Sequence, residues 1–178
     1  QALVPGGGTI PYPPETADYH HEAELVVAIG REGAAVAPER ALDLVYGYAA
    51  GLDMTRRDLQ ARAKAKGRPW DTAKNFAFSA PAGSLRRVAD GSHVAAGEIA
   101  LTVNGEVRQR GDISDMIWST AEVIAHLSRL ERLLPGDLIY TGTPAGVGAV
   151  TPGDRLVVSI AGLAPLAVTI GPREADFA

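Results

Sequence analysis

The stretch Tyr19-His20-His21-Glu22-Ala23-Glu24-Leu25-Val26-Val27-Ala28-Ile29-Gly30 decides how the chain is organised, because two acids open an otherwise apolar strand. Side chains alternate between the two faces of a β-strand, so Glu22 and Glu24 share one face, with their Cα atoms about 7 Å apart. Two carboxylates at that spacing repel each other unless a cation neutralises them, and a divalent cation that prefers oxygen ligands would do so. A third acid, Asp53, ends the apolar run at residues 46–52. We therefore predict that Glu22, Glu24 and Asp53 form a site for a hard metal ion.

The composition limits the class of protein. Of the 178 residues, 46% are hydrophobic and 21% are charged, so the chain is long enough for one well-buried domain, and we expect a single domain over residues 1–178. The formal net charge is −4 and no basic stripe alternates with aromatic residues, so no nucleic-acid partner is expected. The chain has no cysteine, which excludes disulfides and thiolate metal sites and leads us to expect a cytoplasmic protein. Its apolar runs are far shorter than the ~20 residues that cross a bilayer, so no membrane partner is expected.

Strand patterns outnumber helical patterns and do not alternate with them. The sequence Asn104-Gly105 is a strong hairpin signal, and Ser119 with Glu122 forms a capping box that begins a helix. Predicted strands cover residues 22–30, 46–52, 138–141, 155–160 and 166–170, with a hairpin at 98–109. Predicted helices cover residues 38–45, 55–66 and 120–134, residues 1–14 form an extended edge segment or surface loop, and residues 68–81 form an ordered loop. This pattern predicts an α+β fold with a largely β core.

Two polar residues of the predicted helix at residues 55–66 are candidates for the same site as the acids. Arg57 and Gln60 are three positions apart, so they lie on one face of a helix. Asp53 comes just before this helix, so that face can be directed toward the carboxylate. Each residue also has an ordinary interpretation, since Asp53 alone resembles a helix N-cap and Arg57 alone resembles an exposed cation.

Four motifs, in order along the chain, carry a resemblance to a known family. They are His21-Glu22-Ala23-Glu24, Gly51-Leu52-Asp53-Met54-Thr55-Arg56-Arg57-Asp58-Leu59-Gln60, Trp70-Asp71-Thr72-Ala73-Lys74-Asn75-Phe76 and Thr141-Gly142-Thr143-Pro144-Ala145-Gly146-Val147-Gly148. Together they resemble the signatures of the fumarylacetoacetate hydrolase family, in particular its small bacterial fumarylpyruvate hydrolase and acylpyruvase branch. The resemblance covers nearly the whole chain. It implies a mixed β-sheet roll with a few flanking helices, a homodimer, and Mg²⁺ or Mn²⁺ held by Glu22, Glu24 and Asp53, with Ca²⁺ also suited to an all-oxygen site.

The resemblance also implies a reaction, the hydrolysis of a carbon–carbon bond in an acylpyruvate such as fumarylpyruvate. A β-diketo acid offers two adjacent oxygens to a cation, which would polarise the ketone and stabilise the enolate. We assign Lys74 to the charge that develops on substrate oxygen, and Arg57 and Gln60 to orienting the substrate. The backbone N–H at Gly142 and the hydroxyl of Thr143 are expected to bind a substrate carboxylate.

Several alternatives stay open. Family members carry an upstream lid segment with a catalytic His, and we expect this chain, which starts at Gln1, to lack that segment. His20 and His21 are secondary candidates for the base that activates water, although adjacent residues of a strand point to opposite faces, so at most one of them faces the site. An oxaloacetate decarboxylase or a 2-oxo-acid isomerase would use the same metal–enolate chemistry. A catalytically silent module that binds a metal and a 2-oxo acid would keep the same acids.

Overall fold

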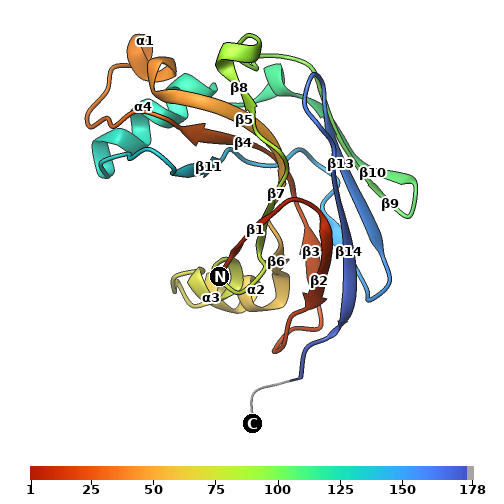
Figure 1. The fold of residues 1–178 in the computed structure, drawn as a ribbon. Coiled ribbons are helices and arrows are strands. Elements are labelled where there is room, and N and C mark those ends of the chain that lie inside the picture. The colour runs from red at the N-terminus through yellow and green to blue at the C-terminus, as the bar shows by residue number, and fades with distance from the viewer. Residues whose placement is uncertain (176–178) are drawn as a thin grey trace.

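The chain is described over residues 1–175 by a computed structural model (Figure 1). Its strands are β1 (Leu3–Pro5), β2 (Gly8–Tyr12), β3 (Tyr19–His21), β4 (Ala23–Ile29), β5 (Val45–Leu52), β6 (Thr55–Arg56), β7 (Ala80–Ala82), β8 (Arg86–Arg87), β9 (Glu98–Val103), β10 (Glu106–Asp112), β11 (Leu138–Tyr140), β12 (Gly148–Ala149), β13 (Arg155–Ile160) and β14 (Leu166–Arg173). Its α-helices are α1 (Pro38–Ala41), α2 (Arg57–Ala65), α3 (Asp71–Lys74) and α4 (Thr120–Leu130). Short 3₁₀ turns cover Leu42–Leu44, Val88–Asp90 and Ile113–Asp115.

The first sheet has the strand order β1-β7-β5-β4-β11, and β8 also pairs with β5. All seven residues of β4 are buried. A strand that is covered on both faces has to be apolar on both, which explains the uninterrupted apolar run in this part of the sequence. β4 and β5 are antiparallel and place Glu24 opposite Gly51, where an added Cβ would come within 2.3 Å of the Val26 side chain. Glycine at position 51 therefore lets the sheet pack closely beside the acid.

The second sheet has the strand order β10-β9-β13-β14-β2, and a small third sheet has the order β12-β3-β6. Asn104 and Gly105 connect β9 to β10 with φ angles of 53° and 86°, the left-handed conformations that a two-residue hairpin turn favours. The predicted hairpin is therefore confirmed. β1 pairs in parallel with β7 and β2 pairs in parallel with β14, so the N-terminal segment lies at an edge of both larger sheets.

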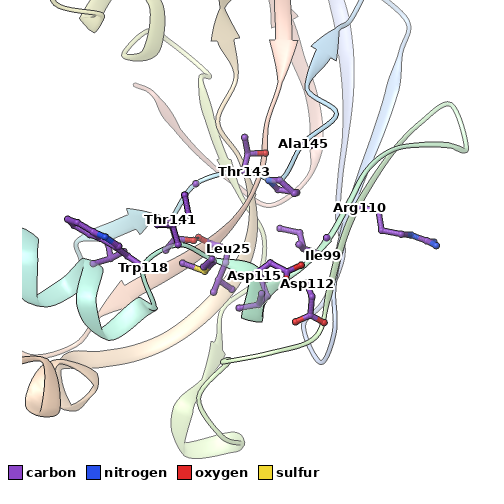
Figure 2. A pocket seen from close by; sticks show the side chains of 16 residues that line it. Leu25, Ile99, Arg110, Asp112, Asp115, Trp118, Thr141, Thr143 and Ala145 are labelled. Atoms are coloured by element: carbon purple, nitrogen blue, oxygen red, sulfur yellow. The ribbon is translucent and has the colours of Figure 1, made fainter.

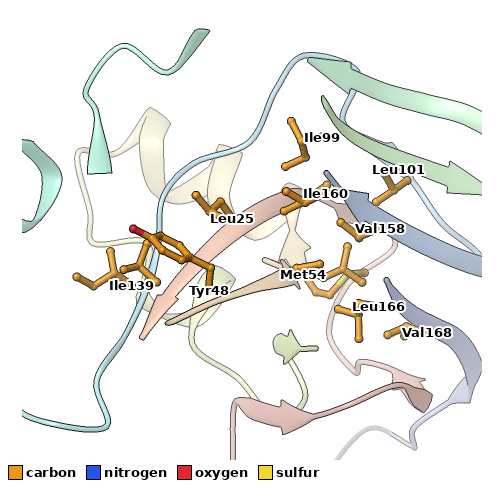
Figure 3. Packing of buried hydrophobic residues seen from close by; sticks show 14 of the residues in the cluster. Leu25, Tyr48, Met54, Ile99, Leu101, Ile139, Val158, Ile160, Leu166 and Val168 are labelled. Carbon is orange, nitrogen blue, oxygen red and sulfur yellow. The ribbon is translucent and has the colours of Figure 1, made fainter. Parts of the chain in front are cut away.

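The hydrophobic core lies between the two larger sheets (Figure 3). Leu25 and Tyr48 of the first sheet and Leu101, Val158 and Leu166 of the second are each at most 1% exposed. Burying one such side chain fully stabilises a fold by about 1.5–3 kcal/mol, so this core, more than the short helices, holds β4 and β5 in place. The α+β class with a mixed β core is confirmed.

The helices lie at two ends of the molecule, with α1 and α4 beside one end of the first sheet and α2 and α3 at the other (Figure 1). Helix α4 begins at the predicted capping box, in which the Ser119 side chain accepts from the Glu122 N–H. It ends at Leu130, earlier than predicted, because Glu131 is extended and Leu133 pairs with Gly33 in an isolated β-bridge. No helix in residues 1–175 is long and apolar enough to span a membrane.

Three other boundaries differ from the prediction for local reasons. The helix expected from residue 55 begins at Arg57, because Thr55 pairs with His20 in the third sheet. The helix expected at residues 38–45 is one turn of α-helix followed by a 3₁₀ turn. The segment at residues 68–81, predicted as an ordered loop, contains the four-residue helix α3, which ends at Lys74.

Candidate functional site

The three acids come together where β4 begins and β5 ends. Glu22 immediately precedes β4, Glu24 is its second residue, and Asp53 immediately follows β5. The pairing of Ala23 with Leu52 sets these segments side by side, and the Asp53 N–H donates to the Glu22 carbonyl oxygen at 2.9 Å. One carboxylate oxygen from each acid lies within 4.8 Å of the other two. We call Glu22, Glu24 and Asp53 the acid cluster; their role as metal ligands stays a prediction.

Burial makes negative charge costly in the acid cluster. Glu22 is 7% exposed and Glu24 is 4% exposed. Burial raises the pKa of Glu24 to about 7; the N–H of Gly142, which donates to it at 2.8 Å, opposes this shift, and the charges of Asp53 and Glu22 add to it. Burial also raises the pKa of Asp53, although Lys74 opposes the shift. A cation placed among these oxygens would remove the cost of keeping all three ionised.

Lys74 inserts its ammonium group into the acid cluster. Its Nζ donates to Glu22 at 2.8 Å, to Asp53 at 2.6 Å and to the Thr55 hydroxyl at 2.8 Å. Burial lowers the pKa of Lys74, but its hydrogen bonds to Asp53 and Glu22 outweigh burial, so the pKa is raised. Lys74 is therefore charged and lies next to any ligand that reaches the cluster.

Arg57 and Gln60 lie on one face of α2 and extend that face to the acids. The Arg57 Nη2 donates to Glu22, and its Nη1 donates to the Gln60 side-chain oxygen at 2.5 Å. The side chains of Arg57 and Lys74 are each 25% exposed. The structure thus brings together the candidate residues of α2 and α3 with the acids of β4 and β5.

The turn at residues 141–145 borders the acid cluster from the other side. The Thr141 hydroxyl donates to the Leu25 carbonyl oxygen at 2.9 Å, and the Gly142 N–H donates to Glu24. The Gly142 N–H, expected to face a substrate carboxylate, therefore acts on the acid cluster in this structure. The Thr143 hydroxyl accepts from the Gln109 side chain at 2.8 Å. The roles of Gly142 and Thr143 toward a substrate stay predictions.

The two adjacent histidines have different environments. The ring Nε2 of His20 lies 2.7 Å from an Asp18 carboxylate oxygen. His21 is buried, with its Nδ1 3.0 Å from the side-chain oxygen of Gln109, and burial lowers its pKa despite that contact. An amide oxygen only accepts, so the contact requires a proton on the Nδ1 of His21.

Sequence reasoning missed two residues that contact this site, Thr55 and Gln109. Thr55 follows Asp53 by two positions at the end of a strand, so the alternation of side chains could have identified it. Gln109 carries no comparable signal, because its contacts with His21 and Thr143 depend on the tertiary structure.

A mainly apolar cavity of about 690 Å³ borders the same turn, and none of the three acids lines it (Figure 2). Leu25 lines it, and the Leu25 side chain points to the face of β4 opposite to Glu24. The other walls come from β9, from the end of β10 with Arg110 and Asp112, from the Ile113–Asp115 turn and the segment after it that includes Trp118, and from α4. Arg110, Asp112 and Asp115 also line the cavity, but buried carboxylates that contact a lysine and an arginine are found at the acid cluster.

The donor set of the acid cluster fits a hard divalent cation. Carboxylate oxygens are the ligands that Mg²⁺, Mn²⁺ and Ca²⁺ prefer, and three of them leave coordination positions for a ligand. Hydrogen bonds orient the three carboxylates: Glu24 and Asp53 each accept through one oxygen, from the Gly142 N–H and from Lys74, whereas the two oxygens of Glu22 accept from Arg57 and Lys74.

Comparison with known proteins agrees with this geometry. The family model described as fumarylacetoacetate (FAA) hydrolase C-terminal matches residues 1–171, so the chain belongs to the fumarylacetoacetate hydrolase family. Fumarylpyruvate hydrolase of Ralstonia sp is 50% identical over 174 residues, which are 98% of this chain and 90% of that protein. Mitochondrial oxaloacetate tautomerase of Rattus norvegicus is 42% identical over 165 residues, which are 91% of this chain and 73% of that protein.

A solved structure gives the same result for the fold. The crystal structure of fumarylpyruvate hydrolase from Pseudomonas aeruginosa in complex with Mn²⁺ and pyruvate has a TM-score of 0.95 and 48% sequence identity to this chain. The match covers 97% of this chain and 76% of that one. The family and the fold that the sequence motifs predicted are confirmed, and the chain is an enzyme of this family.

Proposed function

We propose that this protein is a metal-dependent hydrolase that cleaves a carbon–carbon bond in an acylpyruvate, a β-diketo acid. One observation carries the proposal: Glu22, Glu24 and Asp53 converge within 4.8 Å, and Lys74 and Arg57 donate into the same cluster. Such a site combines ligands for a cation with fixed positive charges for an anionic substrate. The likeness to fumarylpyruvate hydrolases over nearly the whole chain supports this choice of substrate class.

Glu22, Glu24 and Asp53 would hold Mg²⁺ or Mn²⁺, which supplies Lewis-acid polarisation of the substrate ketone. The Gly142 N–H and Arg57 keep the Glu24 and Glu22 carboxylates oriented, each by a hydrogen bond to one carboxylate oxygen. Ligands whose rotamers are fixed in this way lose little entropy when the cation binds.

Lys74 and Arg57 have separate tasks in this proposal. The Lys74 ammonium stabilises the negative charge that develops on the substrate oxygen, because it is charged and only partly solvated. Arg57, held by Gln60, orients the substrate through its planar guanidinium group. Thr143, at the turn on the opposite side, offers its hydroxyl to the substrate carboxylate.

The reaction balances without an added oxidant or reductant. Water adds to the acyl carbonyl, the bond between that carbon and the methylene carbon breaks, and the electron pair stays with the pyruvate enolate. Protonation of the methylene carbon then gives pyruvate, and the acyl group leaves as a carboxylic acid. Lys74, Arg57 and Thr143 act on the oxygens of the pyruvate half of the substrate. The proposal therefore does not specify the acyl group that is released.

A second candidate is an isomerase that moves a proton between the keto and enol forms of oxaloacetate. The 42% identity to an oxaloacetate tautomerase favours it specifically. Both reactions pass through an enolate of a 2-oxo acid, so the same charged groups would serve either one. They differ in whether a carbon–carbon bond breaks.

Product analysis separates these functions. Fumarylpyruvate, acetylpyruvate and oxaloacetate are incubated with the purified protein, with and without Mg²⁺ or Mn²⁺, and the products are identified by NMR. We expect metal-dependent release of pyruvate and fumarate from fumarylpyruvate. Faster interconversion of the oxaloacetate tautomers without cleavage of an acylpyruvate would select the isomerase. Loss of carbon dioxide from oxaloacetate would select a decarboxylase. Metal binding with no reaction of any substrate would reject the hydrolase, the isomerase and the decarboxylase.

A further inference from the structure

Strand β10 carries a buried amide in an otherwise exposed strand. Gln109 is 1% exposed, whereas its neighbours Arg108 and Arg110 are exposed. The pairing of β10 with β9 shifts register between Val107 and Gln109, which leaves Arg108 as an extra residue. Such a β-bulge redirects the side chain that follows it. The bulge therefore turns Gln109 inward, toward the segment before β4.

All polar groups of the Gln109 side chain are used, and they connect two parts of the site. Its oxygen accepts from the Ala23 N–H at 3.0 Å and contacts the His21 Nδ1 at 3.0 Å. Its nitrogen donates to the Thr143 hydroxyl at 2.8 Å and to the Pro144 carbonyl oxygen at 2.9 Å. Ala23 lies between Glu22 and Glu24, so one amide joins the backbone between two acids to the turn beside the site.

The hydrogen-bond partners determine the positions of the oxygen and the nitrogen in the Gln109 amide. The Ala23 N–H can only donate, and the Pro144 carbonyl can only accept, so a flipped amide would place like groups against each other at both ends. The Thr143 hydroxyl consequently accepts from Gln109. Within residues 1–175 the Thr143 hydroxyl donates no hydrogen bond, so its hydrogen is available to a ligand.

The turn is packed directly against the bulge. A Cβ at Gly146, which has a φ of 99°, would lie 2.2 Å from the Arg108 carbonyl oxygen. A Cβ at Gly111 would lie 3.1 Å from Pro144. The turn therefore depends on glycine at 146 to reach β10, and its position follows the position of β10.

We propose that Gln109 is a positioning residue of this site, one that holds the turn at residues 141–145 at a fixed distance from the acid cluster and directs the Thr143 hydroxyl to donate to an oxygen of an anionic 2-oxo acid. The inference rests on the proposed function for the class of ligand. It assigns Gln109 no contact with the ligand. Its effect passes through Thr143.

A double-mutant cycle tests this dependence. The variants are Gln109→Met, Thr143→Val and the double variant, with Glu106→Gln at the exposed start of β10 as a matched control. Pyruvate is titrated into the Mn²⁺-loaded protein by calorimetry, and Mn²⁺ binding is measured separately by electron paramagnetic resonance. We expect each single variant to weaken pyruvate binding about 10-fold, because a hydrogen bond to a charged oxygen is lost or misaligned. The double variant should bind pyruvate no more weakly than the single variant that has the lower pyruvate affinity.

A second variant separates the two ends of the amide and guards against loss of folding in Gln109→Met. Gln109→Glu keeps an acceptor for the Ala23 N–H but removes the donor to Thr143, and its carboxylate would itself accept the hydroxyl proton of Thr143. We expect this variant to bind pyruvate as weakly as Thr143→Val does, and to bind Mn²⁺ within about threefold of the parent protein, since Ala23 stays in place.

Independent losses in the cycle, so that the double variant is weakened by the product of the two single effects, would overturn the proposal. Unchanged pyruvate binding in Gln109→Glu would also overturn it. The proposed function is tested apart from these results, because pyruvate binding requires no turnover. A parent protein that binds Mn²⁺ and pyruvate but cleaves no acylpyruvate would reject the hydrolase and leave the coupling measurable.

Discussion

The acid cluster and the apolar cavity border the same turn at residues 141–145, but they differ in the burial and pairing of their charged groups. In the acid cluster, buried carboxylates face a lysine and an arginine, and burial raises the pKa of Glu24 to about 7. The cavity is about 690 Å³ and is lined mainly by apolar groups such as Leu25 and Trp118. The two regions therefore offer a ligand different surroundings, mainly apolar in the cavity and densely charged at the acid cluster. Substitutions in the two regions test whether metal binding and turnover depend on the acid cluster or on the cavity.

The largest effect is expected from Glu24→Gln. The amide oxygen can still accept from the Gly142 N–H, but it supplies no negative charge to a cation. We expect Mn²⁺ affinity to fall at least about 100-fold and acylpyruvate cleavage to be lost, with circular dichroism unchanged. Titration with Mn²⁺ and a turnover assay measure these effects, and full activity in this variant would reject the acid cluster as the metal site.

Lys74→Met is expected to reduce turnover by about 100-fold without preventing Mn²⁺ binding. The variant keeps most of the side-chain volume but removes the ammonium group that donates to Glu22 and Asp53. Steady-state kinetics at saturating Mn²⁺ measure the loss. Lys64→Met, an exposed position of α2, is the matched control and should behave as the parent protein. Equal turnover in Lys74→Met and Lys64→Met would show that Lys74 has no role in the reaction and only neutralises the acids when no metal is bound.

The metal-free protein should lose stability, relative to Glu24→Gln, as the pH rises from about 4.5 to about 7. Burial raises the pKa of Glu24 from its ordinary 4.5 to about 7, so the folded state binds this proton more tightly than the unfolded state. The contribution is present below pH 4.5 and is lost by about pH 7, and its size is on the order of 3 kcal/mol at most. Urea unfolding in the presence of a chelator across this pH range measures the contribution. Parallel plots of unfolding free energy against pH for the parent protein and Glu24→Gln would contradict the prediction.

The smallest effect is expected from Trp118→Ala in the apolar cavity. Trp118 is 48% exposed and contacts His126 ring to ring at 4.9 Å, so its removal should cost about 1 kcal/mol of stability. It lies outside the acid cluster, so Mn²⁺ affinity should stay within about twofold of the parent value. A loss of Mn²⁺ affinity comparable to that of Glu24→Gln would remove the contrast between the two regions.

Local sequence rules predicted the parts of the site that depend on strand geometry. Alternation placed Glu22 and Glu24 on one face of a strand, and the apolar runs predicted the two strands whose pairing, seen in the structure, brings Asp53 to them. Helical spacing put Arg57 and Gln60 together. These inferences succeed because each depends on residues close in sequence or on a strong apolar pattern.

The remaining parts depend on contacts between distant segments. Helix α3 has only four residues, too few for a periodic signal, and Lys74 at its end is fixed by acids from two strands. Gln109 reaches the site because of a bulge that involves one extra residue in β10. Helix α4 ends early at Leu130 because the following residues pair with Gly33, far away in the sequence. Single-sequence patterns contain no trace of such long-range pairings.

The N-terminal strands have a consequence for how the protein is made. β1 pairs with β7 near residue 80, whereas β2 pairs with β14 near residue 169, so β2 can join the second sheet only after the much later strand β14 has been synthesised. Contacts so distant in sequence slow folding, because a long loop has to close before they form. β1 and β2 are thus synthesised long before β14, and a nascent chain that stops short of β14 exposes an unpaired strand edge to aggregation.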